Sequence, residues 1–373
     1  MSAPPKPLLI YGVNGDGRGH AARALVLAPY LRPYYRLAFH SSQDALALLR
    51  QSFVNQDDIA FVEISGTRWI YRHRRISPWR SALHFLAQAL WVFPWEARRL
   101  VHTWRDTPPA GVICDFEPVV ARAAALAGLP LVALSHQHAM AVMDPAKLGL
   151  WPFQQWIYRL YAWLNTPRFG ALVISSFFQL PLRTRASPTL VVGGLLRPEL
   201  LQLSQGDQRV EGAPLAYLRR QCPPQPVLIG LQQLAPGTVV FGLDDSQGLA
   251  FSRLRFCPVD PNGFLIFLAA APFLVAAAGH QLLCEAMELQ KPVLALYERA
   301  HDEQRLNARL WERAGYGMAV ELESFETHHL KAFIERLPRY RCALQQRVGA
   351  QDNAPATACW MLRQLQAPPS AWR

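Results

Sequence analysis

The chain has 373 residues, a formal net charge of +11 and 51% hydrophobic residues. This apolar content excludes a disordered chain, the length allows two domains of ordinary size, and the basic charge favours an anionic partner such as a nucleotide or a membrane surface. The six cysteines are far apart and form no C-x-x-C pair, which indicates reduced thiols and a cytoplasmic protein. The pattern predicts no signal peptide and no span of the ~20 apolar residues that a bilayer requires.

Predicted strands and helices alternate through the first half of the chain, which is typical of an α/β protein with a parallel sheet. Short apolar runs predict strands at Leu8–Val13, Arg36–Phe39, Ile59–Ile64, Val112–Cys114, Leu131–Leu134, Leu172–Ser175 and Thr189–Val192. Helices are expected from Ala21 to about Leu31, from Val119 to Ala127 and from Trp151 to Leu164. Ligands of such sheets bind beyond the carboxyl ends of the strands, so the turns that follow the strands are the places to search.

The turn after the first strand is rich in glycine and leads into a helix. Gly17 and Gly19 would let the backbone come close to a ligand, and GRGHAA fits the G-x-G-x-x-A variant of a dinucleotide-binding turn. That interpretation requires an acidic residue at the end of the next strand, where this chain has HSS. His20 could therefore cap its helix or face a ligand, and Arg23, one turn further on, could face the same ligand.

The stretch Arg68–Arg105 combines eight arginines and five tryptophans with one acidic residue, Glu96. Arginine and tryptophan on an amphipathic stretch are typical of a helix bound to the surface of an anionic membrane. The same residues could stack the bases of a single-stranded nucleic acid, or could cover the sheet as an ordinary helical pair. We expect a membrane surface or a lipid-like acceptor as the partner, and no nucleic acid.

Two further strand ends carry acidic and histidine side chains. Asp115 and Glu117 follow one strand, and His136 and His138 follow the next. Because the carboxyl ends of parallel strands meet at one edge of a sheet, these four side chains and His20 are expected to line one cleft. Asp115, His136 and His138 could formally hold zinc, but they match no metal-ligand spacing, so no metal is expected.

The second half repeats the alternation after a polar stretch, Pro198–Gly212, that predicts a linker between two domains. Residues 1–197 would form one domain and residues 213–350 the other, and a helix within 351–373 is expected to pack back on the first. Other predicted elements are strands at Ala216–Leu218, Thr238–Phe241 and Leu254–Phe256, helices at Val227–Leu234, Asn262–Leu268, Ser324–Leu337 and Pro355–Leu365, and a polar turn at Asp244–Gly248.

The most informative stretch lies between residues 273 and 308. An apolar strand, Phe273–Ala276, runs into a tight turn at Gly279, and a helix follows. Lys291-Pro292 stops that helix, and a second buried strand, Val293–Leu296, leads to another helix that opens near Glu303. Both turns therefore lie at the carboxyl ends of strands.

These two turns carry groups that suit different parts of one ligand. The first offers free backbone N–H groups at a helix N-terminus, which suits a phosphate, with His280 and Gln281 as helpers. Glu285, one turn into the helix, could accept hydrogen bonds from ribose hydroxyls, and Glu303 with Gln304 suits the hydroxyls of a sugar.

Taken together, the motifs resemble the nucleotide-sugar signature of GT-B glycosyltransferases, in particular the UDP-glycosyltransferases and the MurG-like enzymes. That signature has a Gly, then E-A about six residues on, then a Lys or Gly near a Pro, then D/E-Q-x-x-N-A. The chain matches it with Gly279, Glu285-Ala286, Lys291-Pro292 and EQRLNA at 303–308. It departs from it at Leu282, where the family usually has a Ser or Thr that touches the phosphate. The resemblance implies two doubly wound Rossmann-like domains that face each other across a cleft.

The turn that contains His20 is similar to the loop that opens the acceptor domain of these enzymes. By resemblance, His20 would take the proton of the acceptor hydroxyl, and Asp115 would pair with its ring. The reaction implied is transfer of a sugar from a nucleotide-diphosphate sugar, such as a UDP-sugar, to that hydroxyl, with inversion and without a metal or other cofactor.

The acceptor implied is lipid-linked or a cell-envelope glycan, which would place the protein in the cytoplasm at the inner face of the membrane. Two other functions stay open. A binding or accessory protein on the same fold would account for Leu282, and a nucleotide-sugar epimerase could use Glu117 and Glu303 as its acids.

Overall fold

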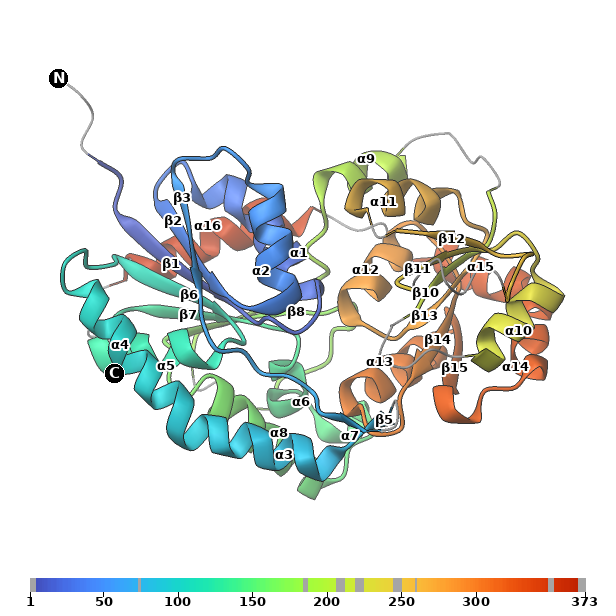
Figure 1. The fold of residues 1–373 in the computed structure, drawn as a ribbon, viewed down its shortest axis with the longest axis horizontal. Coiled ribbons are helices and arrows are strands. Elements are labelled where there is room, and N and C mark those ends of the chain that lie inside the picture. The colour runs from blue at the N-terminus through green and yellow to red at the C-terminus, as the bar shows by residue number, and fades with distance from the viewer. Residues whose placement is uncertain are drawn as a thin grey trace. The chain divides into compact units, whose positions relative to one another are not determined.

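The computed structural model describes residues 5–72, 75–183, 187–205, 212–218, 225–243, 250–258, 260–347 and 352–367. The chain forms two compact units. Unit 1 comprises Met1–Trp69, Trp79–Arg197 and Asp352–Arg373, and unit 2 comprises Ile70–Pro78 and Pro198–Gln351. Each unit is built on a parallel sheet with helices on its faces, as the alternation of elements predicts (Figure 1). The predicted polar turn Asp244–Gly248 lies outside the described residues.

Unit 1 has a seven-stranded parallel sheet with the strand order β3-β2-β1-β6-β7-β8-β9. Its strands are β1 (Leu8–Val13), β2 (Arg36–Ser41), β3 (Ile59–Glu63), β6 (Gly111–Asp115), β7 (Leu131–Leu134), β8 (Ala171–Ser175) and β9 (Thr189–Val192). All seven were predicted, with ends that differ by at most two residues. The order reverses between β1 and β6, so the carboxyl ends of these two neighbours form the switch point of the sheet.

Helices cover both faces of this sheet because side chains alternate along each strand. On one face, α1 (Gly19–Leu31), α2 (Gln43–Ser52) and α16 (Asn353–Leu365) share a core with Leu9, Tyr11 and Val13 of β1. Figure 1 shows α16 beside α1. On the other face, α5 (Pro118–Ala127) comes so close to β1 that a Cβ on Gly12 would lie 2.8 Å from the Cβ of Val120. Glycine at this position permits the contact.

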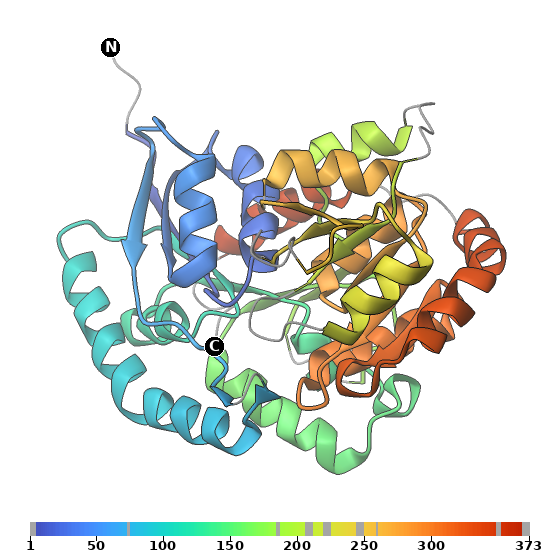
Figure 2. The same cartoon turned by 45° about the vertical axis from the view of Figure 1, so that its right-hand side comes forward.

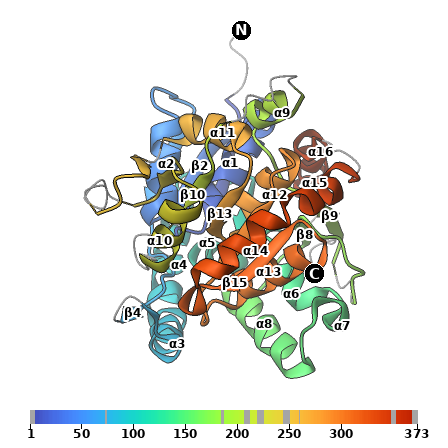
Figure 3. The same ribbon diagram turned by 90° about the vertical axis from the view of Figure 1, so that its right-hand side faces the viewer.

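The outer helices of unit 1 include most of the predicted stretch Arg68–Arg105. α3 (Pro78–Ala87), the π-helical turn η1 (Gln88–Val92) and α4 (Phe93–Trp104) run as one long helical segment (Figure 2). α6 (His138–Val142), α7 (Pro145–Leu148) and α8 (Pro152–Asn165) are neighbours (Figure 3). Residues 70–78 of the predicted stretch belong to unit 2 instead, where β4 (Tyr71–Arg72) and β5 (Arg75–Ile76) form a short antiparallel hairpin.

Unit 2 has a six-stranded parallel sheet with the order β12-β11-β10-β13-β14-β15. Its strands are β10 (Leu215–Tyr217), β11 (Val239–Phe241), β12 (Arg255–Cys257), β13 (Leu274–Ala277), β14 (Val293–Tyr297) and β15 (Gly317–Glu321). The order reverses between β10 and β13, so this sheet also has a switch point. β15 is the one strand of the set that the sequence did not predict.

The helices of unit 2 correct two predictions. α9 (Pro198–Gln205) occupies the first part of the predicted linker, because its Leu200 is buried and the helix packs on its neighbours α11 and α12; residues 206–211 lie outside the described part of the chain. A single helix was expected over Ser324–Leu337, but Pro338 starts a new one. The helical elements are α10 (Gln225–Leu234), α11 (Pro261–Ala270), α12 (His280–Glu288), α13 (Asp302–Arg313), η3 (Leu322–Ser324), α14 (Thr327–Glu335) and α15 (Leu337–Gln345).

None of the helices in the described ranges has both the length and the apolar content that crossing a membrane requires.

Candidate functional site

At the switch point of unit 1, a charged cluster joins the start of α1 to the end of β6. Arg23 is buried and donates from Nε to Oδ2 of Asp115 at 2.9 Å and from Nη2 to Oδ1 at 2.7 Å. His20 places its Nδ1 2.7 Å from the same Oδ1. The three side chains meet because β1 and β6 pair in a register that sets Val13 opposite Asp115. The structure thus brings together three residues that the sequence singled out.

The turn that leads into this cluster is shaped by glycine and asparagine. Gly17 has a φ of +78°, a left-handed conformation that favours glycine, and Gly19 is the first residue of α1. Asn14 accepts a hydrogen bond from the N–H of Asp16 at 3.0 Å and donates to the carbonyl of Phe116 at 2.9 Å. These bonds tie the turn to the residue that follows β6.

The protonation of Asp115 follows from its surroundings. Burial alone would raise the pKa of its carboxyl, but Arg23 and His20 outweigh burial and hold that pKa below its ordinary value. Nη2 of Arg23 also lies 2.8 Å from Nδ1 of His20, and Nδ1 cannot donate to Asp115 and accept from Arg23 at once. The carboxylate is the stronger acceptor, so we assign the proton to Nδ1. Nε2 of His20 then keeps the lone pair that a base requires.

Gln137 is a site residue that the sequence analysis missed. It lies just before α6, with its Nε2 3.5 Å from Nε2 of His20. It stands between His136 and His138, the two predicted site residues of the same string. Strand alternation could not have revealed it, because β7 ends at Leu134 and residue 137 has a helical backbone at the start of α6.

His136 and His138 are buried rather than exposed at the edge of the sheet, which differs from the predicted open cleft. The ring of His136 packs on Phe178, with 5.4 Å between centroids. Nδ1 of His138 lies 2.6 Å from Oγ of Ser135, and its ring packs edge to face on Phe116. Burial lowers the pKa of His138 to about 4, although Asp115 opposes the shift, so this ring is neutral near pH 7. Contact of either histidine with an acceptor stays a prediction.

Glu117 requires a correction. Its buried carboxylate is the N-cap of α5: Oε1 accepts from the N–H of Val119 at 3.0 Å and Oε2 from the N–H of Val120 at 2.6 Å. Burial raises the pKa of Glu117 to about 8, and the two N–H donors lower it by less. The side chain was predicted to line a cleft, but helix capping uses both of its oxygens.

At the switch point of unit 2, the turn after β13 contains glycine and leads into the N-terminus of a helix. Gly279 is the N-cap of α12. Within the described ranges, a Cβ built on Gly279 would meet just one atom within 4 Å, the carbonyl oxygen of Ala277 at 3.9 Å. The space beside the Cα of Gly279 is therefore open, and the N-terminus of a helix suits an anion.

The predicted donor-binding side chains of α12 are buried beneath this turn. His280 and Glu285 are each 4% exposed and Gln281 is 8% exposed. Nε2 of Gln281 lies 3.4 Å from Oε1 of Glu285, and Nε2 of His280 lies 3.4 Å from Sγ of Cys284. Glu285 is thus held in a polar setting and not in a purely apolar interior.

The second predicted donor loop follows β14, the neighbour of β13. His301 is the N-cap of α13 and accepts from the N–H of Gln304 at 3.4 Å, while Oε1 of Gln304 accepts from the N–H of Glu298 at 3.2 Å. Asn307 donates to the carbonyl of Ala278 at 3.1 Å, which ties α13 to the Gly279 turn. Glu303 lies in the first turn of α13 and is half-buried. The side chain of Gln304 therefore stabilises the loop between β14 and α13 through its bond to Glu298. The sequence did not predict that His301 caps α13.

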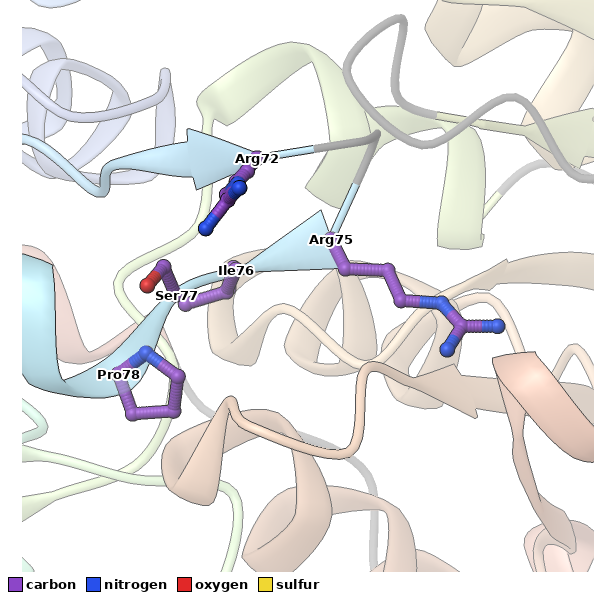
Figure 4. A pocket seen from close by; sticks show the side chains of 5 residues that line it. All are labelled: Arg72, Arg75, Ile76, Ser77 and Pro78. Atoms are coloured by element: carbon purple, nitrogen blue, oxygen red, sulfur yellow. The ribbon is translucent and has the colours of Figure 1, made fainter.

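A hollow of about 610 Å³ lies elsewhere, at the β4–β5 hairpin (Figure 4). Its lining residues are Arg72, Arg75, Ile76, Ser77 and Pro78. None of the predicted catalytic or donor-binding residues is among them. Across the described residues, no group of three His, Cys, Asp or Glu side chains could hold a metal ion.

Comparisons with known proteins agree with this architecture. Residues 8–338 match the model of a family described as Glycosyl transferase family 1. Among solved structures, the chain is similar to the glycotransferase of kitacinnamycin at 16% identity and a TM-score of 0.61, which covers 97% of this chain and 100% of that one. It is similar to MurG of Acinetobacter baumannii at 14% and 0.59, covering 96% and 100%. Arabidopsis thaliana UGT89C1, complexed with UDP, gives 13% and 0.67, covering 97% and 100%. No curated protein matches the chain in sequence.

Proposed function

The chain belongs to glycosyl transferase family 1 and is a glycosyltransferase with the GT-B fold, and from this premise we propose that it transfers a sugar from a UDP-sugar to an acceptor hydroxyl. The observation that carries the proposal is the 2.7 Å contact between Nδ1 of His20 and Asp115 at the switch point of unit 1. An oriented histidine with an unprotonated Nε2 is what proton removal from a hydroxyl requires.

In the proposed reaction, Nε2 of His20 takes the acceptor proton while the acceptor oxygen attacks the anomeric carbon. The bond from that carbon to the diphosphate breaks, and its electron pair leaves with the nucleoside diphosphate. Attack from the side opposite the leaving group inverts the anomeric carbon. Asp115 holds the ring and stabilises the imidazolium that forms, and Arg23 keeps Asp115 ionised.

The leaving diphosphate would be bound at the N-terminus of α12. Backbone N–H groups after Gly279 aim positive potential at the place where negative charge develops, which supports transfer without a metal. The chain also has no D-x-D string that would bridge a metal to a diphosphate. Because Leu282 replaces the usual hydroxyl side chain, these amides would do most of the binding, helped by His280 and Gln281.

The remaining donor groups divide between ribose and sugar. Glu285 is proposed to accept hydrogen bonds from the ribose hydroxyls, and Glu303 with Gln304 to contact the sugar. The acceptor is proposed to be lipid-linked or an envelope glycan, used at the cytoplasmic face of the membrane. The basic charge of the chain supports this location.

The test compares the chain with His20→Ala on labelled UDP-sugars, with and without membrane extract. We expect turnover to fall by about 10²- to 10⁴-fold while UDP affinity, measured by calorimetry, stays unchanged. Normal turnover in the variant would remove His20 from the mechanism. UDP binding without turnover in the unmodified chain would instead indicate an accessory protein, and a changed sugar stereochemistry without an acceptor would indicate an epimerase.

A further inference from the structure

Helix α8 is amphipathic, but it exposes its apolar side and buries some of its polar side chains. Its buried face includes Gln155 and Asn165, whereas its exposed face carries large apolar side chains at the spacing of one helical stripe. Trp151 and Phe153 are 76% and 69% exposed. The exposed members within α8 are Phe153, Trp156, Ile157, Leu160 and Trp163, and the N-cap residue Trp151 is exposed as well. A surface helix of a soluble protein normally turns such a stripe towards the core, so this one indicates a partner.

The segment α3–η1–α4 carries a second stripe of the same kind. Residues 79, 83 and 86 follow one face of α3, and residue 90 continues that face into η1. The π-helical turn shifts the helical phase, so the stripe continues at 91 and 95. Trp91 is 75% exposed. The exposed members are Trp79, Leu83, Leu86, Leu90, Trp91 and Trp95.

The two stripes belong to one region of unit 1. The rings of Phe85 in α3 and Tyr161 in α8 pack with 5.4 Å between centroids, and Figure 1 shows the two helices next to each other. We call the two stripes together the aromatic surface. Twelve large apolar side chains exposed on adjoining helices exceed the scattered apolar residues of an ordinary monomer surface.

Within the helices that carry the two stripes, almost all the charged side chains other than histidine are positive. The guanidinium of Arg99 lies 4.8 Å from the ring centre of Trp95, and that of Arg80 lies 5.8 Å from the ring centre of Trp79. α8 contains no acidic residue. Glu96 is the one acid of α3, η1 and α4, and its carboxylate accepts from the N–H of Ser65. The surface therefore offers an apolar stripe and uncompensated arginines to the same partner.

We propose that the aromatic surface binds the headgroup layer of an anionic lipid bilayer, with α8 and the α3–η1–α4 segment lying in the membrane plane. Tryptophan rings suit the boundary between headgroups and acyl chains, and arginines beside them suit anionic headgroups. A second copy of the chain would bring like charges together, which makes a bilayer the better complement. The role of this membrane surface in sugar transfer rests on the proposed function, in which the acceptor is lipid-linked.

The experiment measures flotation of the full chain with vesicles of phosphatidylglycerol and phosphatidylcholine, and with phosphatidylcholine alone. We expect binding to the anionic vesicles that weakens at high salt. Each double variant, Trp91→Ala/Trp95→Ala and Trp156→Ala/Trp163→Ala, should lower the partition coefficient by about tenfold. Arg98→Gln/Arg99→Gln should lower it on anionic vesicles by about tenfold and change little on neutral ones.

Two matched controls remove exposed apolar side chains outside the aromatic surface. Leu126→Ala in α5 and Ile266→Ala in α11, at 58% and 63% exposure, should bind vesicles as the unmodified chain does. Equal losses in these controls, no vesicle binding at all, or tryptophan-dependent dimers without vesicle binding would overturn the inference. Calorimetry with UDP on the same samples separates the two proposals. If the chain binds UDP but does not float with vesicles, the proposed membrane surface is wrong and the proposed UDP-sugar site is unaffected.

Discussion

The two units place different chemistry at the same topological position. In unit 1 the switch point between β1 and β6 is occupied by a buried ionic cluster, in which Asp115 binds Arg23 and His20. In unit 2 the switch point between β10 and β13 is followed by Gly279 and the N-terminus of α12. One edge therefore offers side-chain charge and an oriented ring, and the other offers backbone N–H groups.

This difference fits the division of labour in a two-substrate transfer. Proton removal needs a titratable side chain whose orientation is fixed by a partner. A leaving diphosphate needs positive potential that is already in place and costs little reorganisation, which backbone dipoles supply. The comparison predicts that substitutions in unit 1 should affect stability and turnover together, and that those in unit 2 should affect nucleotide affinity alone.

The largest effect on stability is expected from Asp115→Asn. The variant would leave Arg23 as a buried cation without its counterion, which should lower the free energy of unfolding by about 3–5 kcal/mol in urea titrations. Because the folded pKa of Asp115 lies below its ordinary value, its contribution is present above the unfolded pKa and is lost as pH falls. The difference between the two proteins should therefore shrink in acid.

A double-mutant cycle supplies the control for this cluster. Replacing both charges, in Asp115→Asn/Arg23→Met, should recover much of the lost stability because no unpaired charge remains. An Asp115→Asn variant as stable as the unmodified chain at neutral pH would show that the cluster is not an ionic network, and the contrast between the two edges would lose its basis.

A smaller effect is expected in unit 2 from Glu285→Ala. If Glu285 accepts hydrogen bonds from ribose, its loss should weaken UDP affinity by about 10- to 100-fold, since hydrogen bonds to charged groups contribute about 1.5–3 kcal/mol. Calorimetry measures the change. Glu288→Ala, three residues further along the same helix and half-buried, is the matched control and should bind UDP normally. Unchanged UDP affinity in Glu285→Ala would defeat the assignment of the donor site.

The sequence predicted the features of both edges that depend on local pattern. Apolar runs identified the strands of unit 1, and the pairing of β1 with β6 then brought His20 and Asp115 together as expected. β15 was missed because its five residues begin with Gly317 and directly follow the end of α13 and the Gly315 turn, which offers little strand signal. Local pattern thus identifies a strand where its residues carry an apolar signal and misses it where they do not.

Features that depend on tertiary surroundings could not be predicted in the same way. Three interpretations of Arg68–Arg105 stayed open because composition alone does not say on which side of a helix tryptophan lies. The structure buries Trp104 and exposes Trp79, Trp91 and Trp95, which excludes an ordinary covered pair with all its tryptophans inside. Glu117 was expected at an open edge because its place after a strand does not show that its side chain turns back to cap α5.

Glu117→Gln is expected to change how stability depends on pH, and it tests whether unit 1 has a second ionised group at its edge. The folded pKa of Glu117 is raised from 4.5 to about 8, so its contribution to stability is fully present below pH 4.5 and is lost as pH rises through 8. The unmodified chain should therefore lose stability relative to Glu117→Gln across this range. The expected change is about 1.4 kcal/mol for each pH unit between the unfolded and the folded pKa. His40 and His138 titrate in both proteins, so their contributions cancel in the difference. A flat difference between the two urea titration series would mean that capping keeps Glu117 ionised throughout, and that Asp115 is not alone as a buried carboxylate at this edge.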